Sequence, residues 1–287
     1  MKSVKSKKKR QEFIKRFCRH KLALAGLFIL AIEIVLILFL PIVMNLDPVG
    51  IETGAFSKPP SVAHILGTDE VGRDVFARLI YGGRVSLGVG IVSTLISIII
   101  GLPLGLLAAY YGGILETIIM RLGDIFMSFP TMILILVLVS IFGPSIVTVT
   151  IVIGVLSWIS IAKLIYSSVI VVKKKEYVES ARAIGTKESV IIWKYILPNS
   201  IAPLWMSVSF RISEAMITES ALSFLGCGVQ PPDSSWGNMI YAAQKLTILT
   251  NQLWMWVPAG FSLMLTIVCI NFIGEGIRDA LDPKMRS

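Results

Sequence analysis

The sequence contains few charged residues. Lysine, arginine, aspartate and glutamate make up 16% of its 287 residues, whereas 55% belong to the hydrophobic class. Ordinary soluble domains carry about 25% charged residues. The apolar residues also occur in long runs separated by short charged stretches, a pattern typical of chains that cross a lipid bilayer several times. The composition therefore argues against a soluble enzyme or a disordered protein and predicts an all-α membrane protein.

Side chains that bind metals, form disulfides or act as catalysts are also scarce. Three cysteines and two histidines are too few for a disulfide framework or a metal cage. The chain has no Gly-Lys pair and so lacks the G-x-x-x-x-G-K-[ST] loop that holds nucleotide phosphates. It also lacks an HExxH motif, a nucleophile elbow and an acid pair placed for hydrolysis. We expect no catalytic residue, metal site or cofactor in this chain.

Six stretches supply the run of about 20 largely apolar residues that a transmembrane helix needs. They are residues 22–44, 85–110, 118–142, 145–172, 201–225 and 252–273. Six crossings place both chain ends on the same side of the membrane. The predicted organisation is a basic tail (1–21), a first transmembrane helix, an extracytoplasmic loop (45–84), a five-helix core (85–273) that contains a cytoplasmic segment (173–200), and a cytoplasmic tail (274–287).

Lysine and arginine identify the side on which the chain ends lie. Ten of the 27 basic residues occur in residues 1–21. With both ends in the cytoplasm, 21 basic residues fall on the inner side and five on the outer side, as the positive-inside rule requires. The net charge of +9 reflects this distribution. No zinc-finger spacing or aromatic-rich sheet pattern accompanies it, so we expect no nucleic-acid partner.

The second predicted span carries one face of small side chains. Ser93, Ser97, Gly101, Gly105 and Ala109 recur every four residues. Such a face lets two helix backbones approach closely in lipid, where no hydrophobic effect drives their association. We therefore predict a close helix–helix contact here.

The fifth span contains ionisable residues, each costing about 2.5–3.5 kcal/mol near the middle of a bilayer. Arg211 and Glu214 stand three residues apart and can pair on one helix. These two residues either pair with each other only or line a transport pathway, and both alternatives remain open. Glu219 precedes Gly226 and Gly228, which we expect to let the outer loop flex. We predict that Glu219 lines or braces an outer gate.

The connection between the fourth and fifth spans is too long and regular to be a simple turn. From Glu176 to Ile184 it predicts a short helix with acids near its start, where they suit the helix dipole. Gly185 is placed to end that helix in a left-handed conformation. A second helix is expected from Thr186 to Pro198. A helix–turn–helix of this kind either docks on a partner or lies on the membrane surface without one.

This segment resembles a known motif. Residues 179–181 (Glu-Ser-Ala), three residues, Gly185, nine residues and then residues 195–198 (Tyr-Ile-Leu-Pro) resemble the EAA motif of binding-protein-dependent ABC importer permeases. The family pattern is Glu-Ala-Ala, three residues, Gly, nine residues, then Ile-x-Leu-Pro. The sequence departs from it at Ser180 and Tyr195, while the glutamate, the glycine and the Leu-Pro pair are in place.

Two further stretches are similar to one branch of that family. Residues 66–78 (LGTDEVGRDVFAR) resemble the GTDxxGRDxxSR segment of dipeptide, oligopeptide and nickel permeases, with Ala77 in place of the usual serine. Residues 222–232, followed by residues 235–238, are similar to the same group, with Cys227 where an apolar residue is usual. Together the stretches indicate the second, C-type permease subunit of such a system.

The resemblance implies a type I importer permease fold in the bacterial plasma (inner) membrane. It implies a heterodimer with a second permease subunit, two cytoplasmic ATPase subunits that bind ATP and Mg²⁺, and an extracytoplasmic substrate-binding protein. The expected cargo is a dipeptide or oligopeptide; nickel or a metal chelate is an alternative, and a self-sufficient secondary transporter is an alternative of another class. The residues assigned to the ATPase-coupling loop are Glu176, Glu179, Ala181, Gly185, Leu197 and Pro198.

Overall fold

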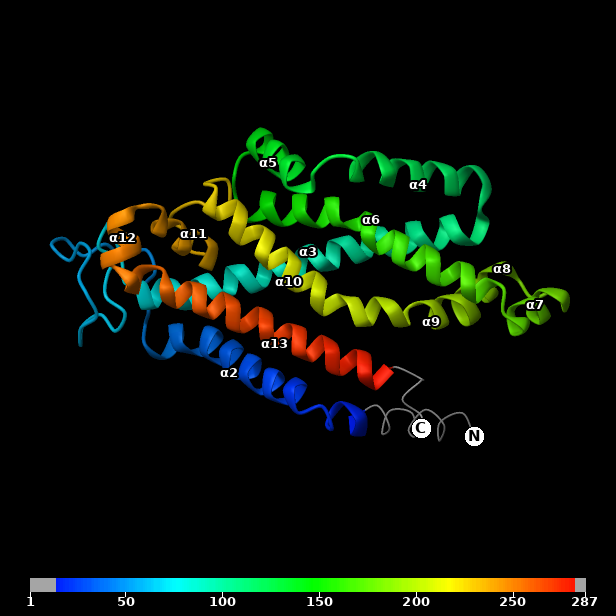
Figure 1. The fold of residues 1–287 in the computed structure, drawn as a ribbon, viewed down its shortest axis with the longest axis horizontal. Helices are drawn as coiled ribbons and strands as arrows, with labels where there is room; N and C mark the ends of the chain where they lie inside the picture. The colour runs from blue at the N-terminus through cyan, green and yellow to red at the C-terminus, as the bar shows by residue number, and fades with distance from the viewer. Residues whose placement is uncertain (1–13, 282–287) are drawn as a thin grey trace.

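Five long helices lie lengthwise beside one another in the computed structural model, which describes residues 14–281 (Figure 1). In lipid every backbone N–H and C=O must find a partner within the protein, and a helix supplies those bonds along each apolar run. Apart from helices, the described residues contain one isolated antiparallel bridge, between Thr68 and Asp74. The long helices are α2 (Lys21–Val43), α3 (Val75–Tyr111), α6 (Ile146–Lys173), α10 (Ala202–Phe224) and α13 (Val257–Leu281).

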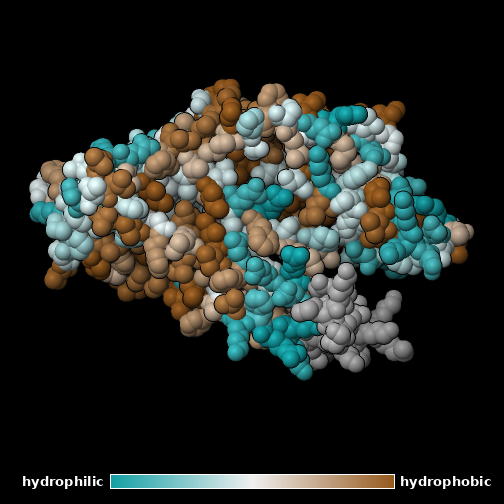
Figure 2. Space-filling view, in the orientation of Figure 1, coloured by the Kyte–Doolittle hydropathy of each residue, from teal (hydrophilic) through white to brown (hydrophobic). Residues whose placement is uncertain are grey.

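The all-helical prediction is confirmed over the described residues, but not every predicted span passes as an apolar helix. Four helices are long and apolar enough to cross a membrane, and a bent pair makes a fifth. Helix α10 is long enough, but it carries Arg211, Glu214 and Glu219. On the outside of the bundle α2 exposes apolar side chains such as Phe28 and Ile42. Figure 2 shows hydrophobic side chains gathered along the helices and hydrophilic ones around the end at which α7 lies.

The second span begins ten residues before the predicted start. Asp74 caps helix α3, because its carboxylate accepts a hydrogen bond of 2.8 Å from the Ala77 N–H. The helix then runs for 37 residues, or about 55 Å at 1.5 Å per residue. It is therefore longer than the bilayer core of about 30 Å. The predicted loop 45–84 gives way to this helix at Val75.

The third predicted span, residues 118–142, is not one continuous helix. It is divided into α4 (Gly113–Met127) and α5 (Thr131–Phe142), whose axes differ by 87°. Pro130 explains the break, since proline has no N–H for the helix ladder and disfavours helical geometry at the residue before it. Apolar content alone does not show this bend.

The predicted face of small residues on α3 packs against α6, in agreement with the sequence. All five of its members are buried. The Ser93 hydroxyl donates a 3.1 Å hydrogen bond to the Thr150 carbonyl. A Cβ added at Gly105 would lie 2.9 Å from the Cα of Ala162, so the two backbones approach too closely for a larger side chain.

Helix α2 is attached to α3 by an arginine. Pro41 lies inside α2 and cannot donate to the carbonyl four residues earlier, that of Ile37. Arg84 of α3 donates to that carbonyl (2.9 Å) and to the carbonyl of Leu38 (2.9 Å). The hydrogen bond lost to proline is thus replaced by one from the neighbouring helix.

The last span is shifted toward the C-terminus relative to the prediction of residues 252–273. Helix α13 begins at Val257 and continues to Leu281, so most of the predicted tail 274–287 is helical. Residues 282–287, and the greater part of the predicted basic tail at residues 1–13, lie outside the described residues.

Short helices gather at the two ends of the bundle (Figure 1). One end carries α7 (Glu176–Ala183), α8 (Glu188–Val190), the π-helical turn η1 (Ile191–Ile196) and α9 (Leu197–Ser200). The opposite end carries α11 (Trp236–Tyr241), η2 (Ala242–Gln244), α12 (Leu246–Asn251) and η3 (Leu253–Met255), beside the segment that precedes α3.

Candidate functional site

Helix α7 forms where the sequence predicts it and has two unlike faces. Val178 and Ala181 are buried and pack in one cluster with Ile191 and Ile196 of η1 and with side chains of α3 and α6. The predicted coupling residues Glu176 and Glu179 are exposed on the other side. The arrangement fixes α7 to the bundle by its apolar face and leaves its carboxylates free to meet a partner.

Gly185 ends α7 by the predicted mechanism. Its φ is +74°, the left-handed region that glycine adopts at little cost. The Gly185 N–H donates to the Arg182 carbonyl (3.0 Å) and the Thr186 N–H to the Ala181 carbonyl (3.1 Å). These two bonds make up a Schellman motif, which satisfies the last carbonyls of the helix.

The second helix of the segment differs from the prediction at both its middle and its end. The π-helical turn η1 precedes Pro198, with the Leu197 N–H bonded to the Ile192 carbonyl five residues earlier. The helical path then continues past Pro198 to Ser200, because proline in the first turn of α9 has no N–H that the helix needs. Leu197 is half-buried and Pro198 is exposed.

The segment also exposes large apolar and aromatic side chains. Tyr177 is 43% exposed, Ile184 82% and Trp193 67%. Lys173, at the end of α6, donates to the carbonyls of Tyr110 (2.6 Å) and Ala109 (3.3 Å) at the end of α3. The segment thus exposes apolar and acidic side chains next to the place where the ends of α3 and α6 are joined by hydrogen bonds.

The predicted pair in the fifth span is formed. Arg211 donates a 2.9 Å hydrogen bond to Glu214. Both residues line a small cavity of about 50 Å³ between α3, α5, α6 and α10, together with serine and threonine side chains such as Ser97 and Ser157. Pairing and contact with a polar cavity therefore occur together.

Glu219 is fully buried rather than open to a pathway. Its carboxylate accepts hydrogen bonds from Ser223 (2.7 Å), Ser86 (3.3 Å) and Ser220 (3.4 Å). The Ser86 hydroxyl in turn accepts one from the Trp236 N–H (3.1 Å). Glu219 therefore braces α10 against α3 and α11.

The two glycines beyond Glu219 differ in their surroundings. Gly226 has a φ of +78° and little around it, whereas a Cβ at Gly228 would collide with the side chain and backbone of Ser223. Gly228 is thus a close-packing position rather than a free hinge. Ser223 contacts both Gly228 and the Glu219 carboxylate.

A cleft of about 610 Å³ opens at the end of the bundle opposite α7, and the sequence did not predict it. Its walls come from the segment before α3, the start of α3, the connection after α10, and α11 to η3. We name it the arginine cleft, after Arg73 and Arg78, which both line it. The signals in the sequence are the density of charge in residues 66–78 and the resemblance of that stretch, and of the one after the fifth span, to the importer permeases.

The walls of the arginine cleft are joined by hydrogen bonds between distant segments. The Trp254 indole N–H donates to the Thr68 carbonyl (3.2 Å), and the Ser234 hydroxyl donates to the Arg78 carbonyl (2.9 Å). Trp236 is buried and donates its indole N–H to the Leu79 carbonyl (3.0 Å). The charged side chains in the cleft are thus held on a fixed frame.

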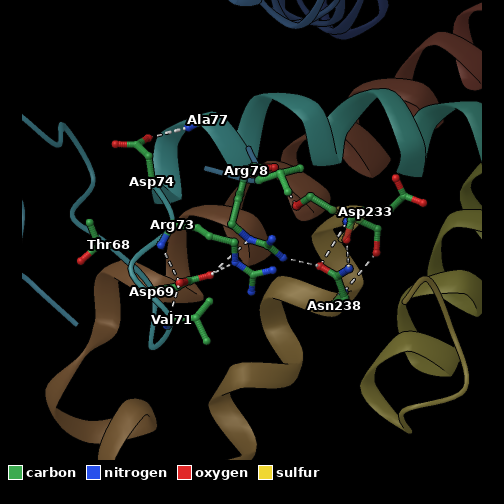
Figure 3. Close-up of polar contacts among 12 residues, drawn as sticks. Thr68, Asp69, Val71, Arg73, Asp74, Ala77, Arg78, Asp233 and Asn238 are labelled. Atoms are coloured by element: carbon green, nitrogen blue, oxygen red, sulfur yellow. Dashed lines mark hydrogen bonds and ion pairs between the residues drawn. The ribbon is translucent and has the colours of Figure 1, made fainter. Parts of the chain in front are cut away.

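Asp69 organises one wall of the cleft (Figure 3). Its carboxylate accepts backbone N–H bonds from Val71 (3.0 Å) and Arg73 (2.9 Å) and a side-chain bond of 2.7 Å from the Arg73 guanidinium. The Arg78 Nε lies 3.6 Å from the same carboxylate. One carboxylate is therefore shared between two arginines.

Arg78 is buried but only partly satisfied. It is 5% exposed, and its Nη2 donates a 3.4 Å bond to the Asn238 side-chain oxygen (Figure 3). Its Nη1 has no hydrogen-bond partner among the described residues. A buried donor without an acceptor costs free energy. Asn238 is held in turn by a capping box with Ser235 at the start of α11.

His64 lies beside the start of α3, although it stands alone in the sequence. Its ring nitrogens are 2.9 Å from the Asp74 carboxylate and 3.0 Å from the Glu52 carboxylate. The hydrogen bond to Asp74, helped by Glu52, raises the pKa of His64 above its usual value. The histidine thus links the preceding loop to the residue that caps α3.

Two protein families match separate parts of the chain. Residues 101–287 match the family described as binding-protein-dependent transport system inner membrane component. Residues 9–60 match the family described as the N-terminal transmembrane domain of oligopeptide transport permease C.

Comparison with curated proteins finds relatives of similar length. The chain is 36% identical to the dipeptide transport system permease protein DppC of Alkalihalophilus pseudofirmus, over 96% of this chain and 90% of the relative. It is 37% identical to the glutathione transport system permease protein GsiD of Pectobacterium atrosepticum, over 96% and 92%. It is 34% identical to the oligopeptide transport system permease protein OppC of Bacillus subtilis, over 94% and 88%.

Comparison with solved structures identifies the fold. A chain of the MetNI methionine ABC transporter, in an inward-facing conformation, superposes with a TM-score of 0.57. The superposition covers 71% of this chain and 96% of that chain at 20% sequence identity. The arrangement of the helices is therefore that of an ABC importer permease.

Proposed function

The chain belongs to the family of binding-protein-dependent transport system inner membrane components, and from this premise we propose that it forms half of the translocation pathway of an ATP-driven importer of dipeptides or oligopeptides. The observation that carries the proposal is the likeness to peptide permeases along nearly the full length of the chain. These relatives favour peptide cargo over nickel or a metal chelate. The test is uptake of a radiolabelled dipeptide by cells with and without this chain; uptake that does not depend on the chain would overturn the proposal.

We propose six crossings of the bacterial plasma (inner) membrane with both chain ends in the cytoplasm. The bent pair α4–α5 serves as the third crossing, and α10 as the fifth. The charges of α10 support its inclusion, because Arg211 is paired and Glu219 is buried among serines, so that they need not face lipid. Cysteine labelling from either side of the membrane tests this topology.

We propose that α7 docks on an ATPase subunit and transmits its closure to the bundle. The exposed Glu176 and Glu179, the exposed Trp193 and the anchoring of α7 on α6 support this role. ATP and Mg²⁺ are then bound by two cytoplasmic ATPases, and a second permease and an extracytoplasmic binding protein complete the importer. Co-purification of the ATPase with wild-type chain, and its loss with Glu179→Lys, would support the docking.

A further inference from the structure

We propose that the arginine cleft binds the free C-terminal carboxylate of a peptide, and that Arg78 is the residue that binds it. The identity of the ligand as a peptide rests on the proposed function. The carboxylate site itself rests on the charges, burial and shape of the cleft, so the two parts can fail separately.

The charges of the arginine cleft do not balance. Among the described residues it is lined by three cationic side chains, those of Arg73, Arg78 and Lys245, and by two carboxylates, Asp69 and Glu70. Lys245 lies 2.7 Å from each carboxylate oxygen of Glu70. Asp69 is bonded closely to Arg73 and lies farther from Arg78, at 3.6 Å. One positive charge is left over, and it falls on Arg78.

That charge lies in the wall of the cleft, which Arg78 lines. The Arg78 side chain is buried, so the protein screens it from water, yet Nη1 has no acceptor among the described residues. Figure 3 shows its guanidinium beside that of Arg73, with the Asn238 side chain on its other side. A carboxylate at Nη1 would satisfy the free donor and supply the missing negative charge. Guanidinium groups bind carboxylates preferentially, through charge-assisted and often paired hydrogen bonds.

The shape of the cleft favours a peptide over the surface of a docked protein. Its volume of about 610 Å³ lies within the range of about 300–1,000 Å³ typical of small-molecule sites. Partly exposed apolar and aromatic side chains, including those of Val71 and Tyr241, line the cleft beside the charges. They offer contacts to the side chains of a short peptide whose terminus is held by Arg78.

The test is calorimetric titration of the full chain in lipid nanodiscs with dialanine, dialanine amide and acetate. Wild-type protein should bind dialanine and should bind acetate more weakly. Its affinity for dialanine amide should be lower than that for dialanine by a factor of about ten or more, because one charged hydrogen bond is worth about that factor. Arg78→Gln should lose about tenfold or more in dialanine affinity. The control Arg121→Gln removes an exposed arginine of α4 that does not line the cleft and should change the affinity by less than about twofold.

Asp69→Asn gives a second, opposite test that does not depend on whether the Arg78 variant folds. It removes the shared counter-charge and should tighten dialanine binding several-fold. Equal binding of dialanine and its amide, or weaker binding by Asp69→Asn in a protein with unchanged melting temperature, would overturn the inference. Binding of acetate through Arg78 without binding of dialanine would assign the carboxylate to a docked protein instead and would also overturn it.

Dipeptide uptake by cells, measured in parallel, separates this inference from the proposed function. If uptake depends on the chain but dialanine binding does not depend on Arg78, only the carboxylate site in the cleft is refuted. Absence of chain-dependent uptake refutes only the importer, because the calorimetry detects the carboxylate site directly.

Discussion

Replacing Gly105 by alanine should destabilise the protein, whereas the same change at Gly88 should not. Both glycines lie in helix α3. A Cβ at Gly105 would stand 2.9 Å from the Cα and 3.0 Å from the carbonyl carbon of Ala162, whereas nothing lies within 4 Å of a Cβ at Gly88. Because the obstacle at Gly105 is backbone, α3 and α6 must move apart to admit the methyl group.

The magnitude follows from two opposing effects. Forcing an extra methyl group into a packed contact costs about 1–3 kcal/mol. Alanine regains about 0.5–1 kcal/mol over glycine within a helix. Because the obstacle is backbone, the cost lies in the upper part of its range, about 2–3 kcal/mol, and the net loss for Gly105→Ala is about 1–2.5 kcal/mol. Each kcal/mol lowers the melting temperature of a protein of 150–250 residues by about 2–4 °C.

The assay is the thermal melting of both purified variants in the same detergent, followed by a thiol-reactive fluorophore or by loss of the monodisperse peak. Gly105→Ala should melt several degrees below wild type, and Gly88→Ala at or slightly above it. Equal shifts of the two variants would show that α3 and α6 are not in close backbone contact and would refute the packing described here.

Three other predictions concern the loop, the buried carboxylate and the coupling helix. The pKa of His64 is raised in the folded protein, so its charged form stabilises the fold fully below about pH 6.5 and progressively less as the pH rises through the folded-state pKa. The melting temperature of wild type should therefore exceed that of His64→Gln by more at pH 6 than at pH 9. A difference that does not depend on pH would contradict this. Glu219→Ala should lower the melting temperature more than Glu219→Gln, since alanine leaves three serine hydroxyls without their acceptor at about 1 kcal/mol each. If Glu219→Gln left transport and substrate-stimulated ATPase activity unchanged, a role of Glu219 in the gate would be excluded. Gly185→Ala, strained by about 1–2 kcal/mol in the left-handed region, should reduce substrate-stimulated ATPase activity of the assembled importer, whereas the exposed Ser180→Ala should leave it unchanged; equal activities would show that the geometry of this turn does not affect coupling.

The elements that follow from local physics were predictable from the sequence. The apolar runs indicate helices because lipid leaves the backbone no other partner. The four-residue repeat of small side chains indicates the face of α3 that meets α6. Gly185 indicates the end of α7, since a left-handed residue and the carbonyls it satisfies are neighbours in the chain.

The arginine cleft could not be predicted in the same way. Arg78 meets Asn238, which is 160 positions away, and the frame around them depends on contacts such as that of Trp254 with Thr68. Likewise Glu219 is buried among serines of α3 and of its own helix α10, a fact that its spacing from Gly226 does not reveal. Pro130 is visible in the sequence, but the apolar residues on either side of it led to the prediction of one continuous span, 118–142, and the break was missed.

The most direct test of the central claim is ATP-dependent peptide uptake by reconstituted liposomes. The chain is inserted with its permease partner, with and without the ATPase subunits, and supplied with the binding protein and a radiolabelled dipeptide. We predict uptake only when the ATPases and ATP are both present. Accumulation of the dipeptide by the permeases alone would contradict the account, because the chain would then drive transport without receiving energy through α7.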